Sequence, residues 1–201
     1  MTPHLHSAER GRPREFDMDS ALDKAMVLFR EKGFQAAAIS ELGQVMGLTV
    51  GSIYKAFGDK NRLFTAVFAR YLAQRHAALK ERIAGKTNGL EKIAALIDFY
   101  LDSAQEVEGR RGCLVVGSTV QLQVLAPLLA AQVEQAVSSQ QGYLAALIAE
   151  GQADGSISSE IDGETATSLL QSLLYGLRVA GKVANPGDHQ RTIAMALKIL
   201  Q

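Results

Sequence analysis

Cysteine and long apolar runs are scarce in this sequence of 201 residues. A single cysteine excludes an internal disulfide framework and fits a reducing compartment. No apolar run approaches the roughly 20 residues that a membrane-spanning helix requires, and the N-terminus lacks the apolar core of a signal peptide. These absences predict a cytoplasmic protein without a membrane segment.

Groups that could cooperate in catalysis or in metal binding are also few. No HExxH motif, no pair of cysteines and no Gly-x-Ser-x-Gly segment occurs. The four histidines are scattered, at His4, His6, His76 and His189. We therefore predict no enzyme activity, no cofactor and no metal site.

Strand signals are scarce as well, because no long alternation of apolar and polar residues occurs and Ala, Leu, Gln and Glu dominate. This composition predicts an all-α fold. The formal net charge is zero but unevenly spread: residues 1–82 carry 13 Lys and Arg against 9 Asp and Glu, and residues 83–201 carry 8 against 12. A basic first part and an acidic remainder suit a nucleic-acid-binding domain joined to a domain with another task.

Residues 38–64 contain the clearest local pattern. Apolar residues recur at helical spacing up to Met46, and Gly47 ends that helix because glycine readily adopts a left-handed conformation. Thr49 is a natural N-cap for a second short helix over residues 50–57. Gly58 ends this helix, and Asp59 caps a longer one. Two short helices joined by a turn around a glycine predict a helix-turn-helix unit, whose second helix enters the major groove of DNA.

The run G-L-T-V-G-S-I-Y-K-A-F-G-D-K-N-R-L, from residue 47 to residue 63, resembles the signature of the TetR family of bacterial transcriptional regulators. The matching positions are Gly47, Thr49, Gly51, Tyr54, Phe57, Lys60 and Leu63. One departure is Ala38, where the family usually has a serine or threonine cap, a loss of about 1 kcal/mol of local stability. The departure places one backbone-phosphate contact in doubt and leaves the motif intact.

The resemblance implies an N-terminal three-helix DNA-binding domain, which we assign to residues 16–62 and which follows a flexible basic arm over residues 1–15. Arginines in such an arm can follow the negative potential of a narrow minor groove, although a solvated tail is the alternative interpretation. The predicted DNA contacts are Arg10, Arg12, Arg14, Ala38, Thr49, Val50, Ser52, Tyr54, Lys55 and Lys60.

The remainder, residues 63–201, is assigned to ligand binding and dimerisation. The long helix after Asp59 is expected to reach about Gly85 and to connect the two domains mechanically. Five more helices are expected, over residues 90–109, 113–125, 128–153, 163–184 and 188–200. The leucines of residues 169–177 cannot all face one interior, and the resemblance implies a homodimer formed through residues 162–184 and 188–200.

By analogy with the family, an unknown small-molecule effector would bind inside the C-terminal bundle. The candidates are polar groups on otherwise apolar faces: Tyr100, Cys113, Gln121, Tyr143, Gln171 and Tyr175. For each of these residues alone, an ordinary place in the core is an equally good interpretation. Cys113 follows two arginines and opens a helix, conditions that lower a thiol pKa, but free cysteine is also commonly a small buried hydrophobe.

Together these features predict a homodimeric regulator, expected to be a ligand-responsive repressor, that binds a palindromic operator in double-stranded DNA. Two alternatives remain open. One is a helical ligand-binding module that never contacts DNA, and the other is a redox-sensing module that responds through Cys113.

Overall fold

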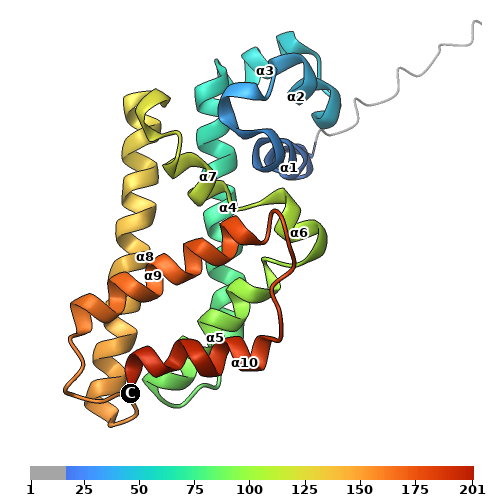
Figure 1. Cartoon of the computed structure of the whole chain (residues 1–201). Helices are drawn as coiled ribbons and strands as arrows, with labels where there is room; N and C mark the ends of the chain where they lie inside the picture. The colour runs from blue at the N-terminus through green and yellow to red at the C-terminus, as the bar shows by residue number, and fades with distance from the viewer. Residues whose placement is uncertain (1–16) are drawn as a thin grey trace, which may run out of the picture.

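The structure, a computed structural model, describes residues 17–201, and the part described is helical with no strand (Figure 1). The all-α prediction is therefore confirmed. Arg10, Arg12 and Arg14 lie outside the described residues. Across residues 17–201, no helix is both long enough and apolar enough to cross a membrane. The helices are α1 (Met18–Ala36), α2 (Ile39–Met46), α3 (Val50–Phe57), α4 (Lys60–Ile83), α5 (Gly89–Asp102), α6 (Glu106–Arg111), α7 (Leu114–Thr119), α8 (Pro127–Asp154), α9 (Gly163–Ala180) and α10 (His189–Ala196), with short 3-10 helices η1 (Leu122–Val124) and η2 (Leu197–Leu200).

Local capping rules fix the boundaries of α3 and α4. The Thr49 hydroxyl accepts a hydrogen bond from the backbone N–H of Ser52 at 3.1 Å, and α3 covers the residues expected for the second short helix. The Asp59 carboxylate accepts from the N–H of Arg62 at 2.8 Å, so α4 begins at the residue that the sequence indicates. Both predicted caps are confirmed.

The first of two hydrophobic cores joins α1–α4 to α7 and to the first half of α8. At its centre the rings of Phe29 and Phe64 meet edge to face with centroids 4.9 Å apart. Leu114 and Leu129 close the same core from α7 and α8. The small N-terminal helices are therefore not packed alone, because residues distant in sequence complete their core.

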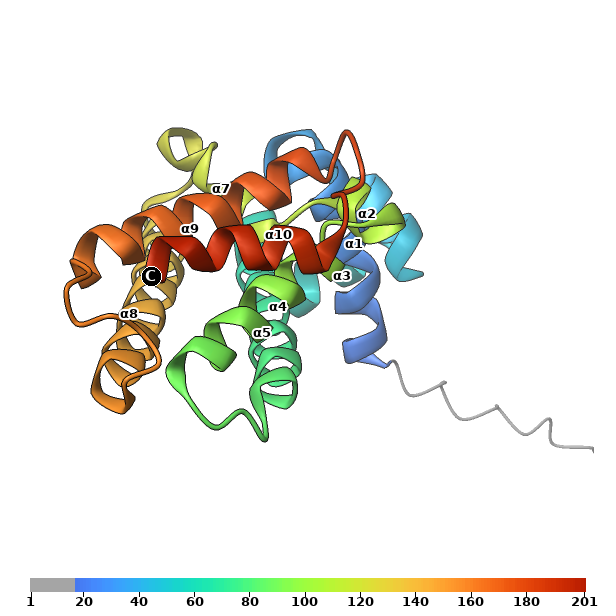
Figure 2. The same cartoon turned by 60° about the horizontal axis from the view of Figure 1, so that its bottom comes forward.

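The second core lies between α5, the second half of α8, α9 and α10. Leu144, Leu170 and Leu174 are fully buried in it, and Ala196 of α10 covers it. α10 lies alongside α5 (Figure 2). Helix α4, 24 residues or about 36 Å long, contributes Phe68 to the first core and Leu79 to the second.

Four of the expected helices differ from the structure. The segment 90–109 is divided into α5 and α6 by a turn, and the segment 113–125 is α7 followed by η1. The backbone of Gly112 has φ +80°, which separates α6 from α7. Helix α9 ends at Ala180, four residues earlier than expected, and the last helix becomes 3-10 after Ala196. Hydrophobic periodicity continued across these turns and therefore hid them.

A bidentate ion pair fastens α1 to α4. Nε and Nη2 of Arg70 donate to the two carboxylate oxygens of Asp23 at 2.6 and 2.8 Å. Nη1 of Arg70 lies 3.0 Å from Oδ1 of Asp19. The hydrogen bonds from Arg70 hold the pKa of the Asp23 carboxyl below its usual value, against a smaller opposing effect of burial. The pair thus fixes the helix that braces the helix-turn-helix unit.

We predict that Asp23→Asn lowers the free energy of unfolding at pH 7 by about 1 kcal/mol, because both groups are partly solvent-exposed. A lowered carboxyl pKa stabilises the folded state above the unfolded pKa, so the difference should shrink as pH falls below about 4. Urea unfolding at fixed protein concentration measures both. Glu160→Gln, at an exposed carboxylate, is the control, and a difference independent of pH would contradict the prediction.

Candidate DNA-binding surface and ligand site

The crossing of α2 and α3 depends on close backbone contact. Gly47 ends α2 with φ +72°, and the N–H of Leu48 donates to the Gly43 carbonyl at 2.8 Å. A Cβ atom at Gly43 would lie 2.7 Å from the Leu48 carbonyl oxygen, closer than packed atoms allow. This glycine, which the sequence motif does not single out, sets how near α3 approaches α2.

One face of α3 is anchored and the other is free. Ile53 is fully buried in the first core, whereas Thr49, Val50, Ser52 and Lys55 are exposed. Tyr54, with 48% of its surface accessible, is also on the exposed side. The predicted contacts of α3 are therefore all exposed, on a helix that is anchored through the buried Ile53.

Open space surrounds Gly51 on the same helix. A Cβ atom at this position would meet only the hydroxyl oxygen of Thr49, at 3.9 Å, which is an ordinary van der Waals distance. The absence of a side chain at Gly51 is therefore not required by packing within the chain. It leaves the first turn of α3 uncovered, where another molecule could approach the backbone.

Two further predicted contacts flank α3. Ala38 makes no side-chain cap, but the Glu41 carboxylate accepts from its N–H at 3.2 Å and takes over part of the cap's role. The Nζ of Lys60 lies 4.7 Å from the centre of the Phe34 ring and donates to the Gln35 carbonyl at 3.3 Å. Partial burial lowers the pKa of Lys60. Ala38 and Lys60 thus both make contacts within the chain itself.

A cluster of polar side chains lies between the two cores, around Cys113. The hydroxyl of Tyr71 donates to Cys113 Sγ at 3.3 Å. Burial raises the pKa of this thiol, but the Tyr71 hydrogen bond, the N–H of Val116 and the charges of Arg178 and Arg75 outweigh burial, so the pKa lies below its usual value. Burial raises the pKa of Tyr71.

Arg178 is the least expected member of the cluster, because only 1% of its surface is accessible. Its Nη2 donates to the Gly112 carbonyl at 2.8 Å, while its Nε and Nη1 have no hydrogen-bond partner among residues 17–201. Arg30 of α1 donates to the same carbonyl through Nε at 3.0 Å and Nη2 at 2.8 Å. One oxygen therefore receives guanidinium groups from α1 and α9.

The structure brings some of the predicted effector residues together and separates others. Tyr100 lies beside Arg75, 5.2 Å from the guanidinium carbon to the ring centre. Burial, and to a smaller extent the Cys113 charge, raises the pKa of Tyr100 and Tyr175. On α9, Gln171 Nε2 donates to the Val137 carbonyl at 3.2 Å. The Tyr175 hydroxyl donates to Oε1 of Gln140 on α8 at 3.3 Å.

Two predicted effector residues lie elsewhere. Tyr143 is exposed on α8. The Gln121 side chain lies against Gly33 of α1, where an added Cβ would be 2.8 Å from its Nε2. Both residues are therefore separated from the cluster around Cys113, because the α7–α8 connection and the outer face of α8 carry them away from it.

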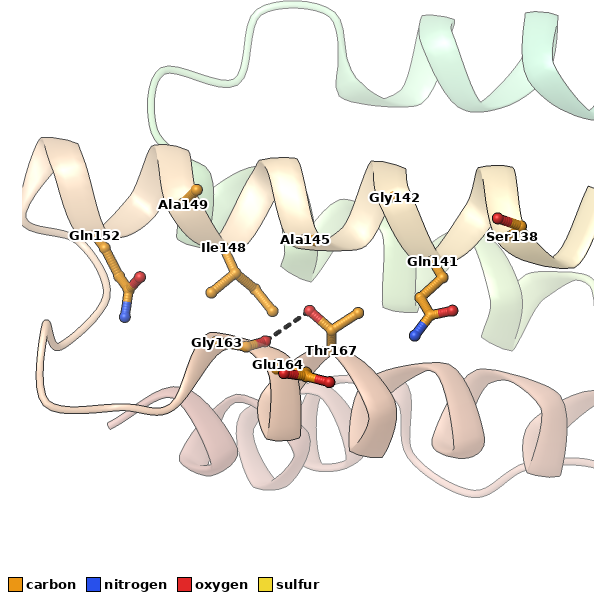
Figure 3. A pocket seen from close by; sticks show the side chains of 10 residues that line it. All are labelled: Ser138, Gln141, Gly142, Ala145, Ile148, Ala149, Gln152, Gly163, Glu164 and Thr167. Atoms are coloured by element: carbon orange, nitrogen blue, oxygen red, sulfur yellow. Dashed lines mark hydrogen bonds between the residues drawn. The ribbon is translucent and has the colours of Figure 1, made fainter.

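Two concave regions of the described chain are relevant to ligand binding. A groove of about 440 Å³ lies between α8 and α9 (Figure 3) and contains none of the six predicted effector residues; it is lined by Ser138, Gln141, Gly142, Ala145, Ile148, Ala149, Gln152, Gly163, Glu164 and Thr167. A smaller pocket of about 220 Å³, which we call the arginine pocket, lies between α1, α4, α5 and α6; it is lined by Met26, Arg30, Tyr71, Gln74, Arg75, Ala78, Phe99 and Glu108.

Arg30, Arg75 and Arg178 are the residues of this region that sequence reasoning missed. One signal was available, because Arg178 follows Leu170 and Leu174 at steps of four residues and so continues the buried stripe of α9. Arg30 likewise follows Leu22 and Met26, and Arg75 follows Val67 and Tyr71, at steps of four residues. Their partners, 82 and 28 residues away, carry no such signal.

Asp98, Asp102 and His189 also lie close enough together to be considered as metal ligands. Arg82 is hydrogen-bonded to both carboxylates, and His189 Nδ1 is 3.4 Å from Asp98. The arginine already supplies a counter-charge, so this cluster is an ion-pair network between α4, α5 and α10.

Comparison with known families gives two matches that together cover most of the chain. Residues 21–67 match the model described as bacterial regulatory proteins, tetR family. Residues 89–197 match the model described as the tetracyclin repressor-like C-terminal domain. The second match alone includes more than half of the sequence.

Individual relatives agree with these matches. The HTH-type transcriptional repressor ComR of Escherichia coli is 27% identical over 176 residues, covering 86% of this chain and 83% of the relative. A cysteine mutant of the TetR family transcriptional regulator CifR, solved with a 26-base-pair operator DNA, is 30% identical with a TM-score of 0.72, covering 94% of this chain and 98% of its own. Reduced NemR of E. coli, 20% identical with a TM-score of 0.78 over 91% of this chain and 96% of its own, shares the fold.

The two glycines of the helix-turn-helix unit should respond oppositely to alanine. Gly43→Ala should lower the free energy of unfolding by about 1–3 kcal/mol, because the Leu48 backbone cannot yield without moving α3. Gly51→Ala, at an exposed helical position, should raise it by about 0.5–1 kcal/mol. Chemical denaturation of both variants at one concentration checks this. A Gly43→Ala protein as stable as the parent would contradict the described crossing.

Proposed function

The chain belongs to the TetR family of bacterial regulatory proteins, and on that premise we propose that it is a non-enzymatic helix-turn-helix repressor that binds a palindromic operator as a homodimer. The observation that carries the proposal is the polar face of α3. Ile53 is buried beneath it, and Ser52, Tyr54 and Lys55 are exposed on a helix held by Thr49. The similarity to CifR, which was solved with a 26-base-pair operator DNA, supports DNA as the partner.

Each group on this face has a chemistry suited to duplex DNA. A lysine and a tyrosine hydroxyl can bind base edges or phosphates, and Val50 can contact a thymine methyl group. Ala38 and Lys60 lie at the starts of α2 and α4, where helix dipoles favour a phosphate. Lys60 would have to exchange its Gln35 contact for a phosphate. The basic arm, with Arg10, Arg12 and Arg14, is proposed to follow the minor groove.

The homodimer is proposed to form through residues 162–184 and 188–200. Apolar side chains on the outside of this region support it: Leu169 is 51% exposed and Val183 is 91% exposed. Val179 and Met195 are exposed as well. Such a surface favours burial against a second copy. Two recognition helices would then contact two half-sites one helical turn apart.

An effector is proposed to bind within residues 63–201, the domain that contains the polar cluster around Cys113. Its binding would alter the position of the DNA-binding domain. The long α4 supports this route, since Phe64 and Phe68 lie in the first core while Leu79 lies in the second. Ligand and operator would each weaken binding of the other by the same factor.

Selection of bound DNA from a random pool tests the proposal directly. The purified chain at near-physiological salt should recover a palindrome, whose half-site spacing would also report the dimer. Recovery of no sequence above background would instead favour the helical module that never contacts DNA.

We predict that Tyr54→Ala combined with Lys55→Ala weakens binding to the selected site at least thirtyfold, about 2 kcal/mol, while the dimer persists. Loss of one lysine should also reduce the salt dependence of binding by about one phosphate contact. Fluorescence anisotropy over a salt series measures both. Lys86→Ala, an exposed lysine in the α4–α5 loop, is the charge-matched control; unchanged operator affinity in the double variant would refute the assignment.

A second trigger, oxidation or alkylation at Cys113, is favoured by the hydrogen bond that Tyr71 donates to its sulfur. The thiolate, rather than the thiol, attacks electrophiles. The lowered pKa would therefore make Cys113 reactive at a lower pH than an ordinary thiol.

Alkylation by iodoacetamide of Cys113, the only cysteine of the sequence, tests the second trigger. The thiolate displaces iodide, and mass spectrometry follows the reaction. The pH midpoint of the rate should lie below that of a free cysteine, and Tyr71→Phe should raise it because the stabilising hydrogen bond is lost. If alkylation leaves operator binding unchanged, or if Cys113→Ser still responds to the same reagent, the thiol is not the trigger.

A further inference from the structure

The arginine pocket carries more positive charge than its surroundings neutralise. Glu108 accepts from Arg30 Nη2 at 2.9 Å and from Arg111 Nη1 at 2.7 Å, and Glu31 lies 3.7 Å from Arg111 Nε. Arg75 and Arg178 have no carboxylate within 4.0 Å in the described part of the chain. Two cations thus lack a counter-charge near the same pocket.

Burial makes this imbalance costly. Moving a guanidinium group out of water is unfavourable unless an anion and full hydrogen bonding compensate for it. Arg178 is almost completely buried, with Nε and Nη1 unpartnered, and Arg75 Nη2 is buried and unpartnered as well. Burial, with the neighbouring charges of Arg75 and Arg30, lowers the pKa of Arg178. An ionised Cys113 would balance only one of the two charges.

The walls of the pocket are aromatic. The Arg75 guanidinium carbon lies 3.9 Å from the centre of the Phe99 ring, and Arg30 lies 5.7 Å from that of Tyr71. Met26 and Ala78 add apolar surface. The volume of about 220 Å³ is below that of pockets for drug-sized molecules, so it suits a compact ligand.

We propose that the arginine pocket is an effector site for a small organic acid, whose carboxylate is held by Arg75 with Arg30 and whose apolar body lies against Phe99 and Tyr71. Arg178 does not line the pocket and adds positive charge from its buried position beside the Gly112 carbonyl. This inference rests on the proposed function and names the class of effector. Guanidinium groups bind carboxylates in a planar, bidentate geometry that neutral ligands cannot reproduce.

The position of the pocket gives such a ligand a direct route to the DNA-binding helices. Arg30 belongs to α1, which braces α2, and it shares the Gly112 carbonyl with Arg178 of α9. A carboxylate that draws Arg30 away from Gly112 would release α1 from the α6–α7 connection. Only a ligand with different affinities for the two arrangements could shift the equilibrium between them.

Calorimetric titration of the full chain with benzoate and hexanoate, each paired with its amide, tests the inference. At least one acid should bind at least tenfold more tightly than its amide, since a charge-assisted contact is lost in the amide. Arg75→Met, at a residue that lines the pocket, should weaken binding of that acid at least tenfold. Arg178→Met should weaken it through the loss of nearby positive charge, and Arg62→Met, at a side chain 76% exposed, should not.

Arg178→Met carries a second expectation that a purely structural role would not produce. Without ligand, this variant should be at least as stable as the parent, because the Gly112 carbonyl keeps Arg30 as donor and an unpaired charge is removed from the interior. If it fails to fold, Arg75→Met still decides the question. Absence of binding by both acids, equal binding of acid and amide, or full binding by both arginine variants would overturn the inference.

Operator binding by the same preparation separates the two levels of the proposal. A chain that binds its operator but neither acid would overturn the acid site and leave the regulator intact. A chain that binds benzoate but recovers no operator would retain the site and overturn the proposed function.

Discussion

The Gly112 carbonyl is the acceptor that α1 and α9 share at the shortest distances, 2.8 Å from Nη2 of each arginine. It receives Arg30 from the DNA-binding side and Arg178 from the C-terminal side. Because two cations at one neutral oxygen repel each other, the arrangement is held by the packing around it and remains sensitive to any added anion. A residue with φ +80° is needed to present this carbonyl, so the conformation of a single glycine connects the two parts of the molecule.

Hydrophobic packing also couples the DNA-binding helices to the C-terminal helices. Leu114 and Leu129 complete the core of the DNA-binding helices. A displacement of α7 or α8 would therefore shift α1 and α4. Close-packed interiors change between discrete arrangements more readily than they deform gradually. The polar face of α3 is fixed to this core through Ile53, and its orientation therefore follows that of α1 and α4.

Polar chemistry and apolar packing thus meet at the boundary between the two cores. Tyr71 belongs to the first core and also donates to Cys113, while Arg75, one turn further along α4, lines the arginine pocket. A continuous helix that carries both residues makes this boundary a natural place for a ligand to act. The thiol and the guanidinium groups share one electrostatic environment, so a change in one alters the pKa of the other.

The sequence by itself determined the features that depend on a few adjacent residues. The caps at Thr49 and Asp59, the bounds of α3 and the all-α class follow from hydrogen bonds and side-chain periods local to each helix. Tertiary structure alone decided the turns that divide α5 from α6 and the gathering of Arg30, Arg75 and Arg178. Those features depend on contacts across as many as 82 residues, and no local rule of periodicity or capping records which distant side chains will share a carbonyl or a pocket.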